Sequence, residues 1–301
     1  MKTLWLFVSV LALSATARAQ DCDHERSRAT WRNTTLFALT YKCVPPGWEE
    51  FFADGTVKAE VKRISNALRK EVRDGGGDVN PALGNVFRAL YSVPPSSIKA
   101  AILGQDPAPT RGQATGLSFS LAPGTAPWRV PSVQRVILEA KNEGFSMDVN
   151  DGDLSAWATH GVLLLNTALT IPCPRDAGSC AIGGHLQQWK KFTAQLLKAV
   201  DAEQKPLAVI LWGSKASSFK SRFVNPLHRV YLGGHPSPVS DPTKFFCRSY
   251  FTCTNKWLDD HHISQIEWSV TEGSPSPPQS CIWTRGKSPT CATACALAAC
   301  N

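Results

Sequence analysis

Three apolar runs, each leading into a polar residue, decide the fold of this chain: Ile102-Leu103-Gly104-Gln105-Asp106, Val162-Leu163-Leu164-Leu165-Asn166 and Val230-Tyr231-Leu232-Gly233-Gly234-His235. Short, continuously apolar runs are typical of strands that are buried on both faces of a parallel sheet. Ligands of open parallel sheets bind beyond the carboxyl ends of the strands. The sequence therefore predicts a site at one edge of the sheet, to which a carboxylate, a carboxamide and an imidazole contribute.

Helical patterns alternate with these runs along the chain. We expect strands at 98–103, 162–165, 207–212 and 229–232. We expect helices from 54 to the glycines at 75–77, from near 132, at 153–157 with Asp153 as N-cap, at 189–200, from 214, and at 246–258. This alternation predicts an α/β fold, a three-layer α/β/α arrangement around a four-stranded parallel sheet.

The chain has 301 residues, 43% of them hydrophobic, which is enough for one sizeable core. Its start has the pattern of a secretory signal, with Lys2, an apolar stretch at 4–13 and a small-x-small cleavage site ending at Ala19. Removal of Lys2 and Arg18 would lower the formal charge from +8 to +6. A modest positive charge is compatible with a polyanionic partner but does not require one.

Ten cysteines behind such a signal indicate disulfides formed in an oxidising compartment. Cys22 with Cys43 and Cys173 with Cys180 are plausible local pairs. Cys247 and Cys253 would face different ways on one helix, and the four tail cysteines could pair in three ways. Asn33-Thr34-Thr35 is a glycosylation sequon. We expect a signal peptide at 1–19, a polar lead with two cysteines at 20–45, one main domain at 46–270, and a Ser/Pro- and Cys-rich tail at 271–301.

The motifs occur in one order, which gives them their specificity. They are Gly104-Gln105-Asp106-Pro107, Gly116-Leu117-Ser118-Phe119-Ser120, Gly152-Asp153-Leu154-Ser155, Gly161-Val162-Leu163-Leu164-Leu165-Asn166, Leu211-Trp212-Gly213-Ser214 and His235-Pro236-Ser237-Pro238. This series, over residues 46–268, resembles the family 1 uracil-DNA glycosylases. The resemblance implies a uracil-DNA glycosylase-like fold and a monofunctional, metal-independent hydrolase without a cofactor. Such an enzyme extrudes uracil from DNA and hydrolyses its N-glycosidic bond, leaving an abasic site for base excision repair.

The resemblance also assigns roles to individual residues. Asp106 matches the acid that positions water and stabilises an oxocarbenium-like sugar, and His235 matches the imidazole that hydrogen-bonds uracil O2. Asn166 matches the amide that reads the pairing edge of the base. Phe119 matches the stacking platform, and Gln105 matches the turn residue whose backbone contacts the base.

Further matches concern contacts with the DNA backbone. Val239 matches an apolar wedge, at a position where the family usually has leucine. The matched phosphate-binding serines are Ser132, Ser214, Ser237 and Ser240. The implied partner is uracil-containing DNA, single- or double-stranded. We expect a monomer that does not associate with a membrane once the signal is removed.

Two features depart from the family pattern. Ala108 stands where the family usually has a tyrosine that excludes the thymine methyl group, so base discrimination is relaxed or another side chain fills the gap. The signal peptide predicts the secretory pathway and secretion, with an organelle reached through the endoplasmic reticulum as the alternative. Both departures keep a second function open, namely a secreted, catalytically weakened DNA-binding or interaction protein on the same fold.

Overall fold

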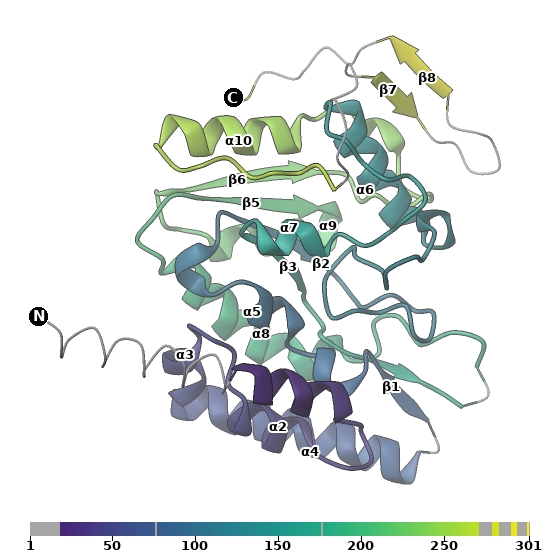
Figure 1. The fold of residues 1–301 in the computed structure, drawn as a ribbon, viewed down its shortest axis with the longest axis vertical. Helices are drawn as coiled ribbons and strands as arrows, with labels where there is room; N and C mark the ends of the chain where they lie inside the picture. The colour runs from purple at the N-terminus through teal and green to yellow at the C-terminus, as the bar shows by residue number, and fades with distance from the viewer. Residues whose placement is uncertain are drawn as a thin grey trace, which may run out of the picture.

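A four-stranded parallel sheet, in the order β3-β2-β5-β6, forms the centre of the computed structural model (Figure 1). The structure describes residues 19–75, 77–175, 177–270, 279–282, 290–293 and 300. The strands are β1 Asp78–Asn80, β2 Ala100–Gly104, β3 Val162–Asn166, β4 Ile171–Cys173, β5 Leu207–Trp212, β6 His228–Gly233, β7 Gln279–Ile282 and β8 Thr290–Thr293. The pairs β1–β4 and β7–β8 form two small antiparallel sheets apart from the central one.

Helices flank the central sheet, with α5 and α7 against β3, and α9 and α10 against β5. Residues 19–28 are helical, and the further α-helices are α2 Leu36–Lys42, α3 Glu49–Ala53, α4 Gly55–Asp74, α5 Arg88–Ser92, α6 Pro131–Asn142, α7 Ser155–Thr159, α8 Leu186–Asp201, α9 Gly213–Ser217 and α10 Tyr250–Asp260. Short 3₁₀ helices are η1 Leu83–Asn85, η2 Pro95–Ser97, η3 Pro127–Arg129, η4 Lys220–Arg222 and η5 Pro242–Lys244. The predicted three-layer α/β/α fold is confirmed.

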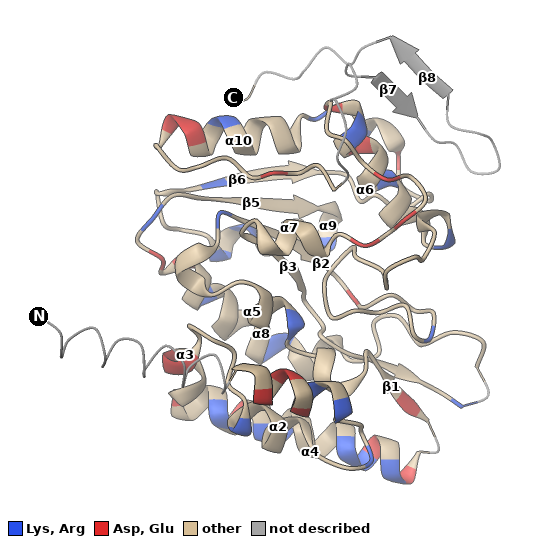
Figure 2. Cartoon of the chain, viewed as in Figure 1, with Lys and Arg blue, Asp and Glu red and all other residues tan. Residues whose placement is uncertain are grey.

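The sheet is held by burial of apolar strands. Every residue of β2, β3 and β5 is buried, and none of them is Lys, Arg, Asp or Glu. Figure 2 shows the charged residues on helices, on loops and on strands β1 and β6 instead, with both signs along α4. The register pairs Gly104 with Asn166 and Trp212 with Gly233, so the carboxyl ends of the four strands meet at one edge.

The expected elements occur near their predicted places, with three local corrections. The last helix begins at Tyr250, not at residue 246, because Cys247 and Ser249 adopt left-handed backbone angles. The first central strand begins at Ala100, not at residue 98, because Ile98 is the C-cap of η2 and Lys99 lies in a bend. Asp153 is not the N-cap of α7: that position is Leu154, and the Asp153 carboxylate instead accepts from the Ser155 N–H at 2.9 Å.

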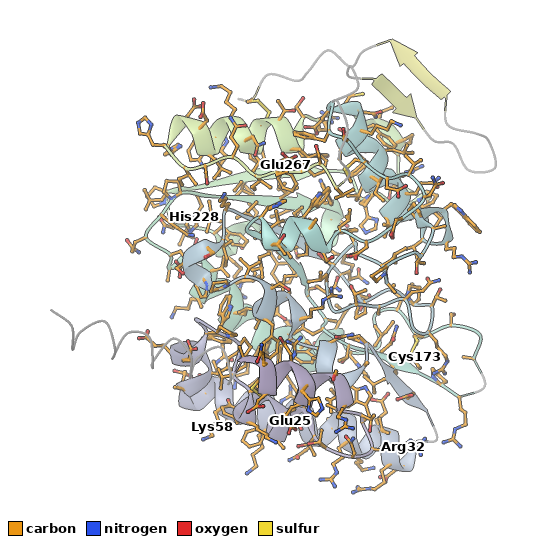
Figure 3. The ribbon with its side chains drawn as sticks, viewed as in Figure 1. Glu25, Arg32, Lys58, Cys173, His228 and Glu267 are labelled. Atoms are coloured by element: carbon orange, nitrogen blue, oxygen red, sulfur yellow. A yellow bond between two sulfur atoms is a disulfide. The ribbon has the colours of Figure 1, made fainter. Side chains whose placement is uncertain are left out.

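The N-terminal segment 20–45 is not only polar. Trp31, Leu36 and Leu39 are buried in the main core, and Lys42 forms an ion pair with Glu25. Figure 3 shows Glu25 and Arg32 in the same region as Lys58 of α4. The predicted domain boundaries remain predictions. Residues 1–18 of the signal predicted at 1–19, and most of the tail predicted at 271–301, lie outside the described residues.

Two predicted disulfides are present, Cys22–Cys43 and Cys173–Cys180. A third joins Cys253 of α10 to Cys300, so the tail cysteines do not pair only with one another. Cys247 is also disulfide-bonded and precedes α10, so the two cysteines do not share a helix. Within residues 19–75, 77–175 and 177–270, the structure contains no helix that is long and apolar enough to cross a bilayer.

The buried strands contribute more to the stability of the fold than exposed apolar residues do. Ile102 is fully buried in β2, whereas the Val224 side chain is 76% exposed. Ile102→Ala should lower the free energy of unfolding by about 2–5 kcal/mol, because it opens a cavity between packed layers. Val224→Ala should change it by less than about 0.5 kcal/mol. Urea denaturation of both variants measures this, and equal losses would contradict the packing described here.

Candidate active site

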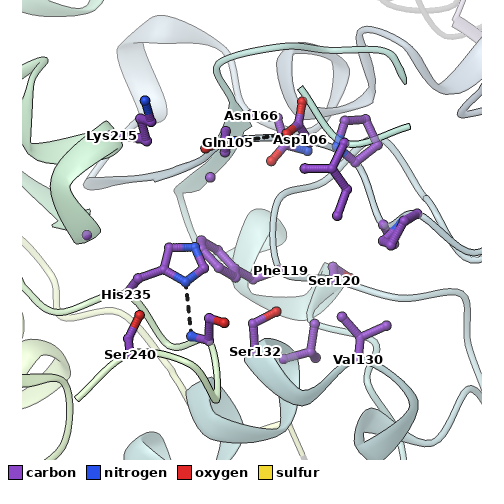
Figure 4. A pocket seen from close by; sticks show the side chains of 18 of the residues that line it. Gln105, Asp106, Phe119, Ser120, Val130, Ser132, Asn166, Lys215, His235 and Ser240 are labelled. Atoms are coloured by element: carbon purple, nitrogen blue, oxygen red, sulfur yellow. Dashed lines mark hydrogen bonds between the residues drawn. The ribbon is translucent and has the colours of Figure 1, made fainter. Parts of the chain in front are cut away.

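One pocket of about 410 Å³ opens at the carboxyl edge of the sheet. The residues that the sequence predicts for the site all line it: Gln105, Asp106, Ala108, Phe119, Ser132, Asn166, Ser214, His235, Ser237, Val239 and Ser240. Figure 4 shows His235 and Phe119 on one side of the pocket, and Gln105, Asp106 and Asn166 on the other. The structure thus brings every predicted residue together, while the individual roles stay predictions.

The ends of β2 and β3 are fixed against each other by close packing. A Cβ atom on Gly104 would lie 2.4 Å from Asn166 Oδ1, so only glycine allows the carboxamide to approach. Thr167 N–H donates to the Gly104 carbonyl at 2.9 Å, and Ala168 N–H donates to the Gln105 carbonyl at 2.9 Å. These bonds hold the turn that carries Gln105 and Asp106 beside Asn166.

Asp106 is a desolvated carboxyl group. Its Oδ2 accepts from Gln105 Nε2 at 2.6 Å and from the Gly183 N–H at 3.1 Å. Its Oδ1 is buried without a hydrogen-bond partner within the protein. Burial raises the pKa of Asp106 above its ordinary value, and the two hydrogen bonds oppose that rise.

Asn166 presents a second unpartnered acceptor. The residue is buried, and its Oδ1 has no hydrogen-bond partner within the protein. An unpaired buried amide oxygen costs free energy, so the site is arranged for a group that would donate to it. An amide offers both a donor and an acceptor, which suits the pairing edge of a base.

The His235 ring is oriented by its own loop. Ser237 N–H donates to His235 Nδ1 at 2.9 Å, so Nδ1 is an acceptor and, in the neutral ring, Nε2 carries the proton. Burial lowers the pKa of His235, which favours this neutral form. The buried Arg135 guanidinium donates to the Ser237 carbonyl at 2.7 Å and fixes the loop from below.

Phe119 is held at the side of the pocket by strained backbone and ring packing. Its φ of 57° lies in the left-handed region, which is uncommon for a bulky residue. The adjacent Ser118 holds this geometry, because its N–H donates to the Leu164 carbonyl at 3.0 Å. The ring packs edge-on against Trp212 with centroids 5.2 Å apart, and lies 6.5 Å from the His235 ring.

The remaining predicted residues lie around the opening. Ser132 is in the first turn of α6, Ser214 is in α9, and Ser237 and Ser240 follow β6. Val239 is 83% exposed, which a wedge that enters DNA requires. Ala108 is partly buried, with its carbonyl accepting from Asn80 Nδ2 at 2.8 Å.

Sequence reasoning missed several residues of the pocket. Ile182 lines it and is 64% exposed, and Lys215 lines it beside Ser214. The Gly183 N–H bond to Asp106 was also missed. The correctly paired Cys173 and Cys180 predicted a closed loop, but nothing in the sequence placed that loop beside Asp106. Among the residues that the structure describes, no cluster of three or more His, Cys, Asp or Glu side chains could hold a metal ion.

Comparisons with known proteins agree with this geometry. The family model described as Uracil DNA glycosylase superfamily matches residues 91–259. A uracil-DNA glycosylase of Azotobacter vinelandii is 35% identical over 226 residues, which are 75% of this chain and 94% of that protein. One from Dictyostelium discoideum is 33% identical over 75% of this chain and 63% of its own length.

A solved structure is similar in fold. The crystal structure of mimivirus uracil-DNA glycosylase superposes with a TM-score of 0.65 at 22% identity, covering 75% of this chain and 87% of that one. The order of motifs, the sheet and the family match agree, and the chain therefore belongs to the uracil DNA glycosylase superfamily.

Proposed function

We propose that this protein is a family 1 uracil-DNA glycosylase, a hydrolase that removes extruded uracil from DNA and leaves an abasic site. The observation that carries the proposal is the gathering of Asp106, Phe119, Asn166 and His235 around one pocket. Relatives at 33–35% identity bear the name uracil-DNA glycosylase, which supports the same activity here. A binding protein with weakened chemistry is disfavoured, because the four groups are all retained in one place.

The reaction replaces the bond between uracil N1 and the sugar carbon with a bond from that carbon to water. The departing base takes the bonding electrons, and the sugar passes through an oxocarbenium-like state. The oxygen of the water bonds to the sugar carbon, and the proton that the water loses ends, overall, on the released uracil. Ionised Asp106 would stabilise this positive charge and orient the water, because its buried Oδ1 is free of protein partners. The surrounding apolar walls strengthen that interaction by excluding solvent.

The negative charge that develops on uracil needs a donor. Neutral His235 carries its proton on Nε2, which would donate to uracil O2 as the charge develops. Phe119 would stack on the base and Asn166 would pair with its edge. These two contacts bind and select the base, while Asp106 and His235 act on the bond that breaks.

Contacts around the pocket suit the DNA backbone. Ser132, Ser214, Ser237 and Ser240 surround the opening, where small hydroxyls can approach phosphates closely. Exposed Val239 would fill the gap that the extruded base leaves. Lys215 beside Ser214 would add a positive charge for the backbone.

The site of action is also proposed. The signal pattern at the start of the chain and the disulfides support the secretory pathway, because disulfides form in oxidising compartments. We propose secretion of a monomer, and an organelle reached through the endoplasmic reticulum is the alternative. DNA outside the nucleus would then be the substrate.

Asp106→Asn and His235→Ala test the chemistry. Each should reduce the single-turnover rate of abasic-site formation on a uracil oligonucleotide, by about 100-fold or more, because each removes transition-state stabilisation. Fluorescence anisotropy should show that both variants still bind the DNA. If the wild-type protein binds uracil DNA but forms no abasic sites, the glycosylase hypothesis is wrong. The hypothesis of a DNA-binding protein without efficient catalysis then replaces it.

Ala108 tests base discrimination. We propose that the small side chain leaves room for a methyl group, so the protein should release thymine as well as uracil, though more slowly. Ala108→Tyr should abolish thymine release and keep uracil release, because the ring would occupy the methyl position. Parallel assays on uracil and thymine oligonucleotides measure this, and a complete absence of thymine release by the wild type would refute relaxed discrimination.

The pH dependence follows from the two shifted groups. Activity requires ionised Asp106, whose pKa burial raises, so the rate should fall at a pH above the ordinary aspartate range as the solution is acidified. Burial lowers the pKa of His235, so this side chain becomes protonated at a lower pH than an ordinary histidine does. The acid limb should persist in His235→Gln at a lower overall rate. Its disappearance in that variant would assign the limb to the histidine.

A further inference from the structure

A disulfide-closed loop contacts the catalytic turn at two points. Cys173 ends β4 and is bonded to Cys180, seven residues later. Cys180 N–H donates to the Pro109 carbonyl at 2.8 Å, and Gly183 N–H donates to Asp106 Oδ2 at 3.1 Å. Segment 180–183 therefore contacts both the Asp106 carboxylate and Pro109, which lines the pocket.

The first end of this segment is anchored by β4 and the disulfide. Figure 3 shows Cys173 beside β1, and the register pairs it with Asp78. Arg111 donates from its guanidinium to the Cys173 carbonyl at 2.9 Å. Cys180 is buried, and the adjacent Ala181 N–H donates to the Pro172 carbonyl at 2.8 Å. The disulfide thus ties segment 180–183 to β4, which pairs with β1.

The other end is anchored by a buried histidine. His185 is 2% exposed, and its ring contacts Thr170 Oγ1 at 2.8 Å and Glu71 Oε2 at 2.9 Å. Between the two anchors, Gly183 has a φ of +80°. A Cβ on Gly184 would lie 2.5 Å from Pro172, so the close approach of the loop requires glycine there. The chain has little freedom to move Gly183 away from Asp106 while both anchors hold.

We propose that the Cys173–Cys180 disulfide is a positioning element of the active site, which fixes the Asp106 carboxylate through the Gly183 N–H. Gly183 is accordingly a positioning residue, and the disulfide does more than stabilise the fold. This inference rests on the proposed function, because it assigns a role in the step that Asp106 performs.

Loss of the Gly183 N–H bond would change the electrostatics of Asp106. The Gly183 N–H favours the ionised form of Asp106, and its loss would leave burial less opposed, so the pKa of Asp106 would rise further. The titratable groups that face Asp106 are His185 from the loop side, and His235 and Lys215 across the pocket. Opening the disulfide removes none of these groups. The expected rise in the pKa of Asp106 would therefore be caused by loss of the Gly183 N–H bond.

Removal of the disulfide tests the role directly. In Cys173→Ser/Cys180→Ser, kcat on a single-stranded uracil oligonucleotide should fall by about tenfold, as expected for a lost hydrogen bond to a charged group. KM should change little, and the acid limb of kcat should move to higher pH. The matched control is Cys22→Ser/Cys43→Ser, whose disulfide joins segments that do not line the pocket. That control should lose thermal stability and keep the wild-type kcat and acid limb.

A second pair of variants keeps the disulfide. Gly183→Ala strains a left-handed residue and displaces its N–H, so it should lower kcat and move the acid limb in the same direction. Gly112→Ala carries the same backbone strain, at a φ of +75° in open space, and should leave both unchanged. If Cys173→Ser/Cys180→Ser fails to fold, this pair still tests the proposal, because an unchanged kcat and acid limb in Gly183→Ala would overturn the positioning of Asp106 through the Gly183 N–H.

The outcomes separate the inference from the function on which it rests. A wild-type protein that excises uracil, together with Cys173→Ser/Cys180→Ser and Gly183→Ala variants that keep its kcat and acid limb, overturns the positioning role alone. A wild-type protein that forms no abasic sites overturns the proposed function itself.

Discussion

The approach of two strand ends, β2 and β3, is the constraint on which the site depends. Gly104 and Asn166 are partners in the parallel register, and the absence of a Cβ on Gly104 lets the carboxamide lie against the strand. The turn after Gly104 then carries Asp106 to the same edge as Asn166. A larger residue at 104 would push the base-reading amide away from the carboxylate, and the two could not act on one nucleotide.

Desolvation adjusts the pKa values of the catalytic side chains, and it also costs folding free energy. Burial raises the pKa of Asp106 and lowers that of His235, and one oxygen each of Asp106 and Asn166, two residues that line the pocket, is buried without a protein partner. Such groups destabilise the folded protein unless the surrounding structure holds them. Here the support comes from Arg135 beneath the His235 loop and from the anchored segment 180–183. Rigid supports around a few desolvated groups are the arrangement that electrostatic catalysis requires.

Much of the fold could be predicted because its signals are local. Continuous apolar runs mark the central strands, and the polar residue after each run marks the functional edge. The start of α10 could not be predicted in this way, because buried Glu139 accepts from the Arg248 N–H and holds the preceding residues outside the helix. Likewise β1 and β4 are three residues each, too short to give a periodic pattern, and they pair across 91 or more positions of sequence.

The site could be predicted in its residue types but not in its supports. Asp106, Asn166 and His235 could be predicted because each is a polar residue that follows an apolar strand. The backbone N–H of Gly183 carries no such signal, because every residue except proline has one and only the folded loop directs it to Asp106. Ile182, an apolar residue in a glycine-rich segment, gives no indication that it lines a pocket.

A crystal structure of the protein with DNA that contains a non-hydrolysable uracil nucleotide tests the central claim most directly. The account predicts that the extruded base stacks on Phe119, pairs with Asn166, and places O2 at hydrogen-bond distance from His235 Nε2, with the sugar beside Asp106. A uracil that stays in the helix, or that binds away from these four side chains, would contradict it.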